Sequence, residues 1–431
     1  MIDRYQTEEM RQLWSEKSKY DHWFKVEMAI LRAWVREGTV PEHVPDTIES
    51  EVELDVDRIK EIEAKTKHDV AAFVDHVEEQ VDAEVGRWFH YGVTSSDILD
   101  TATALRLRKA FSFISDDLIS LLGILRDKAY EVEGIKTMGR THGIHAEPME
   151  LGLLFARWYM EMNRNRKRLG QAFAQIGVGQ ASGPVGNNAS VPLSVEINTL
   201  GVHGLGLSWE PVSTQIIPRD RYAHLIAMFG VLASSIENIA TEIRHRSRTE
   251  VGEFAEGFSD GQKGSSVMPH KKNPILSENL CGLARMIRSN VTPSLENVAL
   301  WHERDMSHSS VERFTLPNTT SLASFALRRL KKVISNLHID EEALERNIKA
   351  NRGRYKSREA LHKLVDRGYH RDKAYRIVQE AAFKSKSEDR DFEDVMASYD
   401  ADVAHYLSEE VDVDTMGEGQ KIINRAFMYH R

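Results

Sequence analysis

A chain of 431 residues is longer than one compact core usually holds, which predicts two or three domains. Hydrophobic residues make up 41% and charged residues 29%, a balance typical of soluble globular proteins rather than disordered ones. Lys and Arg number 57 against 66 Asp and Glu, so the net charge of −9 argues against general binding of nucleic acid. The single cysteine, Cys281, cannot form an internal disulfide and predicts a reducing, cytoplasmic location.

The start of the chain and its apolar stretches argue against export and against a membrane partner. Glu8 and Glu9 follow soon after Met1, and this segment has neither the basic beginning nor the apolar run of a signal peptide. The apolar stretch at 225–233 is too short to cross a bilayer.

Long helices are predicted by the proline positions and by apolar periodicity. No proline lies in residues 46–147 or 318–431, so helices can run there without a missing donor or a ring clash. Apolar residues recur every three or four positions within 107–129, 225–243 and 322–337, which is the helical period, and no convincing strand-like alternation is visible. Helices this long usually lie in bundles and bury part of their apolar stripe against other subunits. The sequence therefore predicts an all-α fold.

Three stretches rich in Gly, Pro, Ser or Asn are predicted as loops, at 177–188, 201–218 and 257–273. Asp340 is a predicted N-cap that opens the last part of the chain. We expect an N-terminal helical domain at 1–93, a central long-helix domain at 94–340 and a C-terminal helical domain at 341–431.

The third loop ends in Asn273-Pro274, which should open a helix, because Asn is a strong N-cap and Pro is favoured at the first helical position. A helix N-terminus offers free N–H groups and partial positive charge, and Lys271 adds a full charge. The loop would thus bring the hydroxyls of Ser265 and Ser266 to a cationic pocket suited to a carboxylate or an oxyanion. The same residue types are ordinary in a solvated loop, and physical reasoning alone divides the two interpretations evenly.

The segment GRTHGIHAEP at 139–148 lies between two helical patterns. His142 is a candidate acid or base, because the unperturbed pKa of histidine lies near neutrality. His142 and His145 could instead bind a metal, but no further Cys/His pair at ligand spacing accompanies them. Taken alone, a polar helix junction with capping histidines is slightly favoured.

Two shorter polar segments have simple structural explanations. Lys67-His68-Asp69 lies within a helical pattern, where adjacent residues do not face each other. The plainer interpretation is that these are ordinary polar residues on the surface of a helix. The segment at 94–97 precedes a helix and is most simply an N-cap box, although it could also bind an anionic ligand.

The segment WHERDMSHSSVER at 301–313 groups arginine, serine and histidine. Arg304 and Arg313 could clamp a phosphate, with Ser309 as an additional donor. The alternative, favoured without other information, is that both arginines pair with the acidic residues of the same segment, which are Glu303, Asp305 and Glu312.

Taken together, these segments resemble a known group of enzymes. The run GSSVMPHKKNP at 264–274 is similar to the highly specific signature GSSxMPxKxNP of the fumarase/aspartase superfamily. Three further segments resemble one family within it, the adenylosuccinate lyases, and they lie at 139–148, 213–222 and 301–313. Arg4-Tyr5 and Lys67-His68-Asp69 also match this family. The resemblance extends to about residue 340 and is weaker beyond.

The resemblance implies a homotetramer of all-α subunits that share a central helix bundle, with active sites built from three subunits and with no metal or organic cofactor. It implies β-elimination of fumarate from adenylosuccinate, giving AMP, and from the succinylcarboxamide ribotide SAICAR, giving AICAR. The reaction would proceed by acid–base catalysis through an aci-carboxylate carbanion.

The resemblance also implies roles for single residues. Ser265 aligns with the base that removes the Cβ proton, and His142 with the acid that protonates the departing nitrogen. Lys271 aligns with a residue that holds the carboxylates, His68 with a residue that assists catalysis, and Glu278 with one that supports the catalytic histidine. The aligned substrate contacts are Arg4, Tyr5, Lys67, Asp69, Thr94, Ser95, Thr141, Gln215, Ser266, Met268, Asn273, Arg304, Ser309 and Arg313.

The chain departs from the family pattern at three places. Residues 179–186 read GQASGPVG where many relatives read GKxSGAVG, residues 351–357 replace a more apolar stretch, and Lys272 stands where arginine is common. Argininosuccinate lyase, carboxymuconate cycloisomerase and a non-enzymatic helical scaffold are the rival interpretations. The residues that would bind a phosphate disfavour the first two, and the combination of Ser265, His142 and Lys271 disfavours the scaffold. The preferred purine substrate, the state of the 257–273 loop without ligand, and the choice of His68 or His142 as proton donor stay open.

Overall fold

The computed structural model describes residues 2–257, 267–268, 270–413 and 417–428. The chain forms two compact units, each assembled from three stretches of sequence. Unit 1 comprises residues 1–119, 164–237 and 282–328, and unit 2 comprises residues 120–163, 238–281 and 329–431. These units are defined by packing, and the three sequential domains proposed above stay a prediction.

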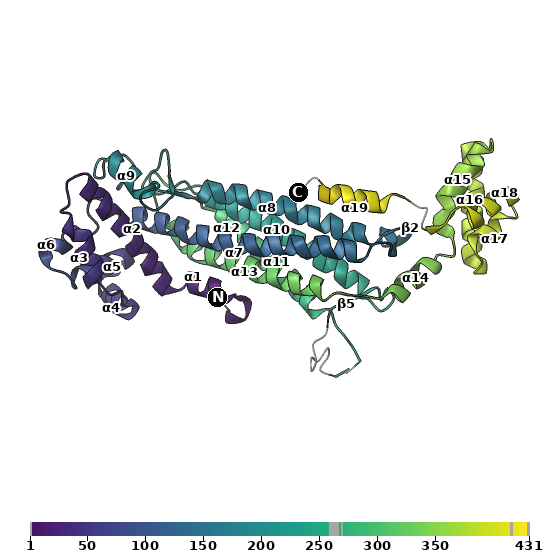
Figure 1. Ribbon diagram of the computed structural model, residues 1–431, viewed down its shortest axis with the longest axis horizontal. Coiled ribbons are helices and arrows are strands. Elements are labelled where there is room, and N and C mark those ends of the chain that lie inside the picture. Colours follow the sequence, from purple (N-terminus) through teal and green to yellow (C-terminus); the bar gives the residue numbers. More distant parts are fainter. Residues whose placement is uncertain (1, 258–266, 269, 414–416, 429–431) are drawn as a thin grey trace. The chain divides into compact units, whose positions relative to one another are not determined.

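The described fold is predominantly α-helical, as the apolar periodicity predicted (Figure 1). Short 3₁₀ helices lie at η1 (Asp3–Tyr5) and η2 (Arg354–Lys356). The α-helices are α1 (Glu8–Leu13), α2 (Glu16–Arg36), α3 (His43–Glu51), α4 (Val56–Thr66), α5 (Asp69–Glu78), α6 (Ala83–Gly86), α7 (Ser95–Glu131), α8 (Gly152–Ile176), α9 (Leu193–Leu200), α10 (Asp220–Arg246), α11 (Ile275–Ser289), α12 (Val291–Glu296), α13 (Ser307–Ser335), α14 (Glu341–Lys349), α15 (Ser357–Asp366), α16 (Arg371–Glu388), α17 (Phe392–Met396), α18 (Ala401–Glu409) and α19 (Gly419–Met428).

Short strands accompany the helices and form two-stranded sheets. The longest pair is the antiparallel hairpin of β1 (Lys136–Thr141) and β2 (Ile144–Glu150). The others are the parallel pair of β3 (Val178–Gly179) with β4 (Ser208–Trp209) and the antiparallel pair of β5 (Phe254–Ala255) with β6 (His338–Ile339).

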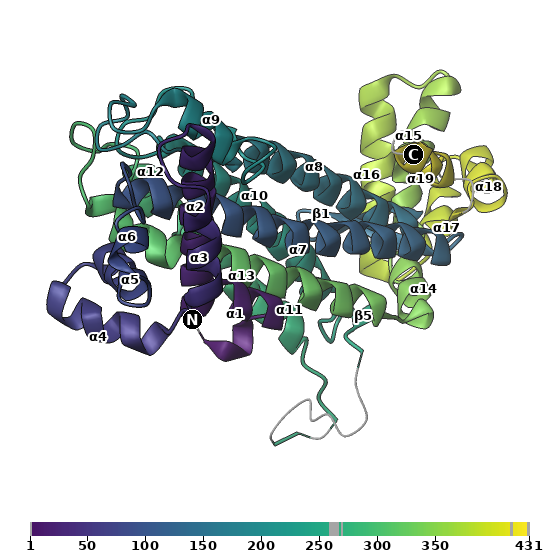
Figure 2. The same ribbon diagram turned by 60° about the vertical axis from the view of Figure 1, so that its left-hand side comes forward.

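The core of unit 1 is built on aromatic residues of α2 and α5. Tyr20, Trp23 and Phe73 are buried, and their ring centroids lie 5.2–5.9 Å apart in stacked and edge-on pairs. Such pairs add to the stabilisation that comes from burying apolar area. Helix α2 also packs against α9 (Figure 2). This core fixes α5, which carries one wall of the site described below.

The long helix α7 begins with the predicted cap. The Thr94 backbone N–H donates to the Asp97 carboxylate at 2.8 Å, which satisfies a donor at the helix start. Asp97 is fully buried and also accepts from the Ser182 backbone N–H at 2.9 Å, and burial raises the pKa of this carboxyl. The cap therefore also fastens the loop at 177–188 to α7.

Among the described residues, α10 is the single helix long and apolar enough to cross a membrane by length and composition. Helix α10 is three times as long as the apolar run at 225–233, and 61% of its most apolar 18-residue stretch is buried inside the protein. Packing in a core accounts for its apolar residues. Pro317 lies inside α13 without ending that helix, although it lacks the N–H that an interior position normally donates.

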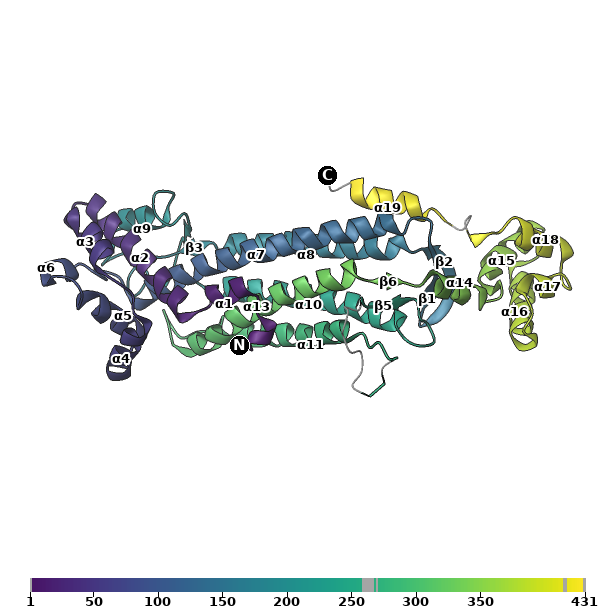
Figure 3. The same ribbon diagram turned by 60° about the horizontal axis from the view of Figure 1, so that its bottom comes forward.

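Helices α15 to α18 of unit 2 form a cluster around Leu364, Phe392 and Leu407. Asp340 caps α14 by accepting from the Ala343 backbone N–H at 2.9 Å, as predicted, and α14 packs beside β1 (Figure 3). In the divergent 351–357 segment, the buried Lys356 ammonium lies 2.7 Å from the Glu393 carboxylate and donates to the Leu407 carbonyl. Within this segment, which departs from the family pattern, Lys356 thus connects α17 and α18.

Candidate functional site

A cavity of about 240 Å³ in unit 1 brings predicted site residues together. Asp69, Arg304, Ser309 and Arg313 line it, and they come from α5, from the segment before α13 and from α13 itself. Residues far apart in sequence thus meet at one place, which neither periodicity nor local motifs could establish. The wall also holds polar residues that are not among the predicted site residues, which are Glu16, Lys19, Ser96, Asp100, Thr103, Arg106, Arg219, His308 and Glu312.

Asp69 reaches this cavity because the chain breaks between α4 and α5. Lys67 has a left-handed backbone (φ 56°), and His68 is the N-cap of α5, its Nδ1 accepting from the Ala71 backbone N–H at 3.2 Å. The prediction that this triplet lies within a helix is therefore wrong. The Asp69 carboxylate pairs with the Arg313 guanidinium at 2.7 Å, while the side chains of Lys67 and His68 are exposed.

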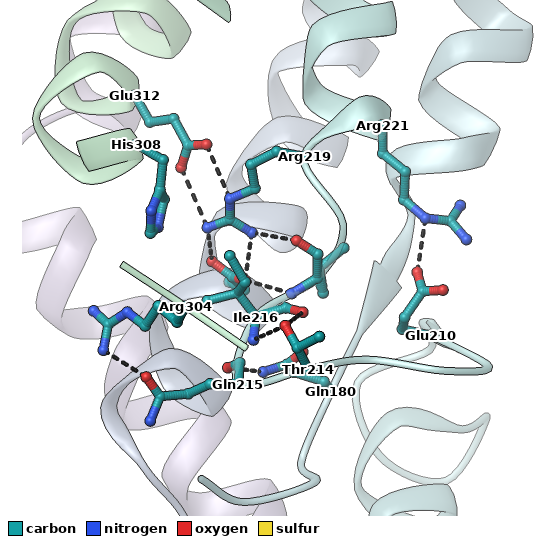
Figure 4. A network of polar contacts seen from close by, with 12 residues as sticks. Gln180, Glu210, Thr214, Gln215, Ile216, Arg219, Arg221, Arg304, His308 and Glu312 are labelled. Carbon is teal, nitrogen blue, oxygen red and sulfur yellow. Dashed lines mark hydrogen bonds and ion pairs between the residues drawn. The ribbon is translucent and has the colours of Figure 1, made fainter. Parts of the chain in front are cut away.

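Arg304 and Gln215 form a second contact between predicted site residues. The Arg304 Nη1 donates to the Gln215 Oε1 at 2.9 Å (Figure 4). The Arg304 Nε is buried without a hydrogen-bond partner, and burial lowers the pKa of this guanidinium. The fully buried Gln180 donates from Nε2 to the Gln215 carbonyl at 2.6 Å, so a residue from the divergent 179–186 segment helps to position the Gln215 backbone.

The centre of the wall is a buried ion cluster around Arg219 (Figure 4). Its guanidinium donates to the Asp100 carboxylate at 2.7 and 2.8 Å and lies 3.0 Å from the Glu312 carboxylate. Burial alone would lower the pKa of Arg219, but the Asp100 and Glu312 carboxylates stabilise the charged guanidinium and raise this pKa overall. Burial raises the pKa of Glu312 to about 7. Arg219 belongs to the 213–222 segment noted in the sequence, but nothing in the sequence singled out Asp100.

The expectation that Arg304 and Arg313 pair with acids of their own segment is wrong for two of those acids. Glu312 binds Arg219, and the Asp305 carboxylate accepts from the backbone N–H groups of Trp301 and Ser307, both at 2.8 Å. The carboxylate that does pair with Arg313 is Asp69, which lies 244 positions away in the sequence.

The segment at 139–148 forms a hairpin and not the helix junction favoured from the sequence alone. His142 and Gly143 are the two residues of its turn, and both have positive φ (54° and 76°), as type I′ turns require. A β-carbon at Gly139 would lie 2.7 Å from the Glu147 carbonyl, which explains the glycine there. His142 and Thr141 are exposed at the turn, whereas burial lowers the pKa of His145.

The predicted helix after the signature loop is present, but it starts at Ile275 and its tip is occupied. The buried Glu256 carboxylate accepts from the backbone N–H groups of Leu276 at 3.0 Å and Ser277 at 2.7 Å. The prediction that this tip offers free donors is therefore wrong for these two groups. A carboxylate at a helix N-terminus is itself a favourable arrangement.

The other predicted residues lie at several places. Ser265 and Ser266 fall outside the described residues. Arg4 is exposed in η1, and the Tyr5 ring packs edge-on against Phe325 at 5.6 Å. Thr94 and Ser95 are half-buried at the start of α7 in unit 1. The predicted site residues that belong to unit 2 are Thr141, His142, Met268, Lys271, Asn273 and Glu278. Within the described ranges, no group of three or more His, Cys, Asp or Glu side chains is placed to hold a metal ion.

Comparison with known proteins places the chain among lyases. Residues 3–289 match the family described as Lyase. The chain is 45% identical over 392 residues to adenylosuccinate lyase of Thermotoga maritima, covering 91% of this chain and 90% of that protein. It is 44% identical over 434 residues to adenylosuccinate lyase of Aquifex aeolicus, covering 100% and 98% of the two chains. The chain belongs to the adenylosuccinate lyase family.

Solved structures agree on the fold. A fumarate lyase from Mesorhizobium sp. BNC1 superposes with a TM-score of 0.89 at 22% identity, covering both chains completely. A 3-carboxy-cis,cis-muconate lactonizing enzyme from Pseudomonas putida has a TM-score of 0.89 at 25% identity, with 99% of this chain and 97% of that one covered. The predicted all-α, fumarase/aspartase-like fold of this lyase is therefore confirmed.

His308, on the cavity wall of this family member, should make stability depend on pH. Burial, together with the nearby Arg219 guanidinium, lowers the pKa of His308 to about 4, below its usual 6.5. The unfolded chain then binds more protons than the folded chain between pH 4 and 6.5, so the free energy of unfolding should fall as pH drops through that window.

We expect His308→Gln to reduce this fall by an amount on the order of 2 kcal/mol, measured by denaturant titration at pH 7.5 and pH 4.5. His405→Gln, at an exposed position, is the matched control. A wild-type pH dependence in His308→Gln would show that this histidine is not the group responsible.

Proposed function

We propose that this protein cleaves adenylosuccinate to AMP and fumarate, and SAICAR to AICAR and fumarate. The observation that carries the proposal is the cavity of unit 1, where Arg304, Ser309 and Arg313 meet. Two guanidinium groups and a hydroxyl can bind a phosphate through several charge-assisted hydrogen bonds. The relatives that match nearly the whole chain carry the name adenylosuccinate lyase, whose substrate bears a phosphate.

The charges around the cavity support an anionic ligand there. Arg219 is already neutralised by Asp100 and Glu312, and the Arg106 guanidinium donates to the Leu13 carbonyl. Arg304 makes only neutral contacts among those described, to Gln215 and the Met306 sulfur. A phosphate could therefore bind Arg304 without displacing an acid, whereas at Arg313 it would compete with Asp69.

The elimination itself needs a base, a stabilised carbanion and an acid. The proton to be removed lies next to a carboxylate, so its loss produces a doubly negative aci-carboxylate. One well-placed donor stabilises such developing charge by roughly 3–4 kcal/mol, and we assign Lys271 this role. Ser265 would act as the base, which requires that donors hold its alkoxide and that water is excluded. His142 would protonate the departing nitrogen.

We further propose that the active site forms only in a homotetramer, with different copies supplying the residues of units 1 and 2. His142 and Lys271 are exposed in the single chain, as expected for groups that face another subunit. Large apolar side chains are exposed as well, among them Met286, Leu295, Trp301 and Phe314 at 54–78%. Contiguous exposed apolar patches are typical of protein–protein contacts, and subunit interfaces in the homotetramer would cover these side chains. The cytoplasmic location stays part of this proposal.

The assembly is tested by mass measurement in solution. We expect sedimentation or light scattering to give four times the subunit mass of 49.1 kDa at the concentration at which the enzyme turns over. An active monomer would contradict the shared site while leaving the substrate assignment open to its own test.

The reaction is tested by following the ultraviolet absorbance of adenylosuccinate and the release of fumarate. We expect turnover of adenylosuccinate and SAICAR, and we expect Ser265→Ala to lower kcat by about 10²–10⁴-fold while substrate still binds. Ser408→Ala, which changes an exposed serine, is the control. Turnover of argininosuccinate alone would overturn the substrate assignment, and near-normal turnover by Ser265→Ala would remove Ser265 as the base.

The phosphate contact is tested with Arg304→Ala. Loss of a charge-assisted hydrogen bond costs about 1.5–3 kcal/mol, so KM for adenylosuccinate should rise by roughly 10- to 150-fold with a smaller change in kcat. Arg126→Ala removes an exposed arginine whose ion pair in the described part of the chain is with the neighbouring Asp127, and it should leave KM unchanged. An unchanged KM in Arg304→Ala would place the phosphate elsewhere.

A further inference from the structure

The hairpin that carries His142 is anchored to a carboxylate buried in unit 2. Glu253 is fully buried, and its side chain accepts hydrogen bonds from three residues. The Arg140 guanidinium donates to both carboxylate oxygens at 2.6 and 3.2 Å, the Arg246 Nη1 donates at 2.8 Å, and the Asn347 amide donates at 2.8 Å. Glu253 therefore connects β1, the C-terminal end of α10 and α14.

The buried Glu253 carboxylate is stable only when all of its hydrogen-bond donors are in place. A buried carboxylate carries a large desolvation cost, which is offset when cations and further donors satisfy its oxygens. Removing one partner leaves the rest of a buried network poorly satisfied. Arg246 also donates to the Thr137 hydroxyl at 2.9 Å, so the cluster holds β1 at two positions, Thr137 and Arg140.

The hairpin needs such an anchor to place His142. A two-stranded hairpin is marginally stable by itself, and this one has an irregular register between Met138 and Arg140. Arg140 is the last side chain of β1 held by the cluster, two positions before His142. The turn that follows is exposed, so the backbone position of His142 depends on how firmly β1 is held.

We propose that Glu253 is a positioning residue for His142: by clamping Arg140 and Arg246 it holds the hairpin in the position from which the imidazole can donate its proton. The inference rests on the proposed function, because it assigns the acid role to His142. Glu253 itself is fully buried in unit 2, so it is placed to act through its neighbours and not directly on a substrate. Its contribution to catalysis would pass through the backbone of β1.

The first test is Glu253→Gln, which keeps the size of the side chain and removes its charge. Misplacement of a catalytic group by about 1 Å can cost about 10²-fold in rate. We expect kcat for adenylosuccinate to fall by roughly 10- to 100-fold, with KM changed by less than about threefold. Arg140→Lys, which keeps the charge but loses the paired hydrogen bonds, should give a smaller fall and provides a second variant if Glu253→Gln does not fold.

A double-mutant cycle separates positioning from general destabilisation. If Glu253 acts through His142, adding Glu253→Gln to His142→Ala should lower kcat little beyond His142→Ala alone. Multiplicative losses would show that Glu253 supports folding without acting through His142, and would overturn the proposal. Asp400→Asn, which removes the charge of a buried carboxylate that pairs with the exposed Arg367 elsewhere in unit 2, is the control and should leave kcat unchanged.

Hydrogen exchange gives a readout that does not depend on turnover. We expect the amides of 136–150 to exchange faster in Glu253→Gln than in the wild type, and not in Asp400→Asn. If the amides of 136–150 exchange as slowly in Glu253→Gln as in the wild type, the proposal is overturned, whichever substrate the enzyme uses. A wild-type enzyme that leaves adenylosuccinate and SAICAR intact would overturn the proposed function instead, while faster exchange would still support the clamp on the hairpin.

Discussion

The pairing of buried Arg219 with Asp100 determines the shape of the candidate site in unit 1. The Asp100 carboxylate also accepts from the Ile217 backbone N–H at 2.9 Å, and Arg219 donates to the Ile217 carbonyl at 2.7 Å, so one ion pair holds the loop that carries Gln215 against α7. Contact with Glu312 extends the cluster to α13. An ion pair this deeply buried is stable only with such additional hydrogen bonds.

The arginines of the cavity differ in whether their charge is already balanced by acids of the protein. Arg219 faces two carboxylates, whereas the Arg304 guanidinium is held by an amide oxygen and a sulfur atom, and Arg313 by the half-buried Asp69. Neutralising Arg219 lowers the cost of placing several arginines around one small cavity. Among the described contacts of the cavity arginines, those of Arg304 and Arg106 are to neutral groups, whereas a ligand at Arg313 would compete with Asp69.

Unit 2 uses buried carboxylates in a similar way. Glu253 gathers the guanidinium groups of Arg140 and Arg246 behind the His142 hairpin, and Glu256 accepts from the first amides of α11 next to the signature loop. Both acids lie close in sequence to residues predicted to react, yet both are buried and satisfied by protein donors. In both units, buried carboxylates thus hold in place the segments that carry predicted site residues.

The sequence alone determined the helical class, the N-cap box at 94–97, the cap at Asp340 and the family, because these follow from periodicity, short-range hydrogen bonds and a contiguous motif. It could not determine the His142 hairpin, whose turn depends on two left-handed residues and on anchoring by Glu253. Nor could it show that Asp69 binds Arg313 across 244 positions, that Asp100 holds Arg219, or that Glu256 occupies the helix tip. These contacts join side chains from distant segments, so their energies depend on burial and on partners that only the folded chain brings within reach.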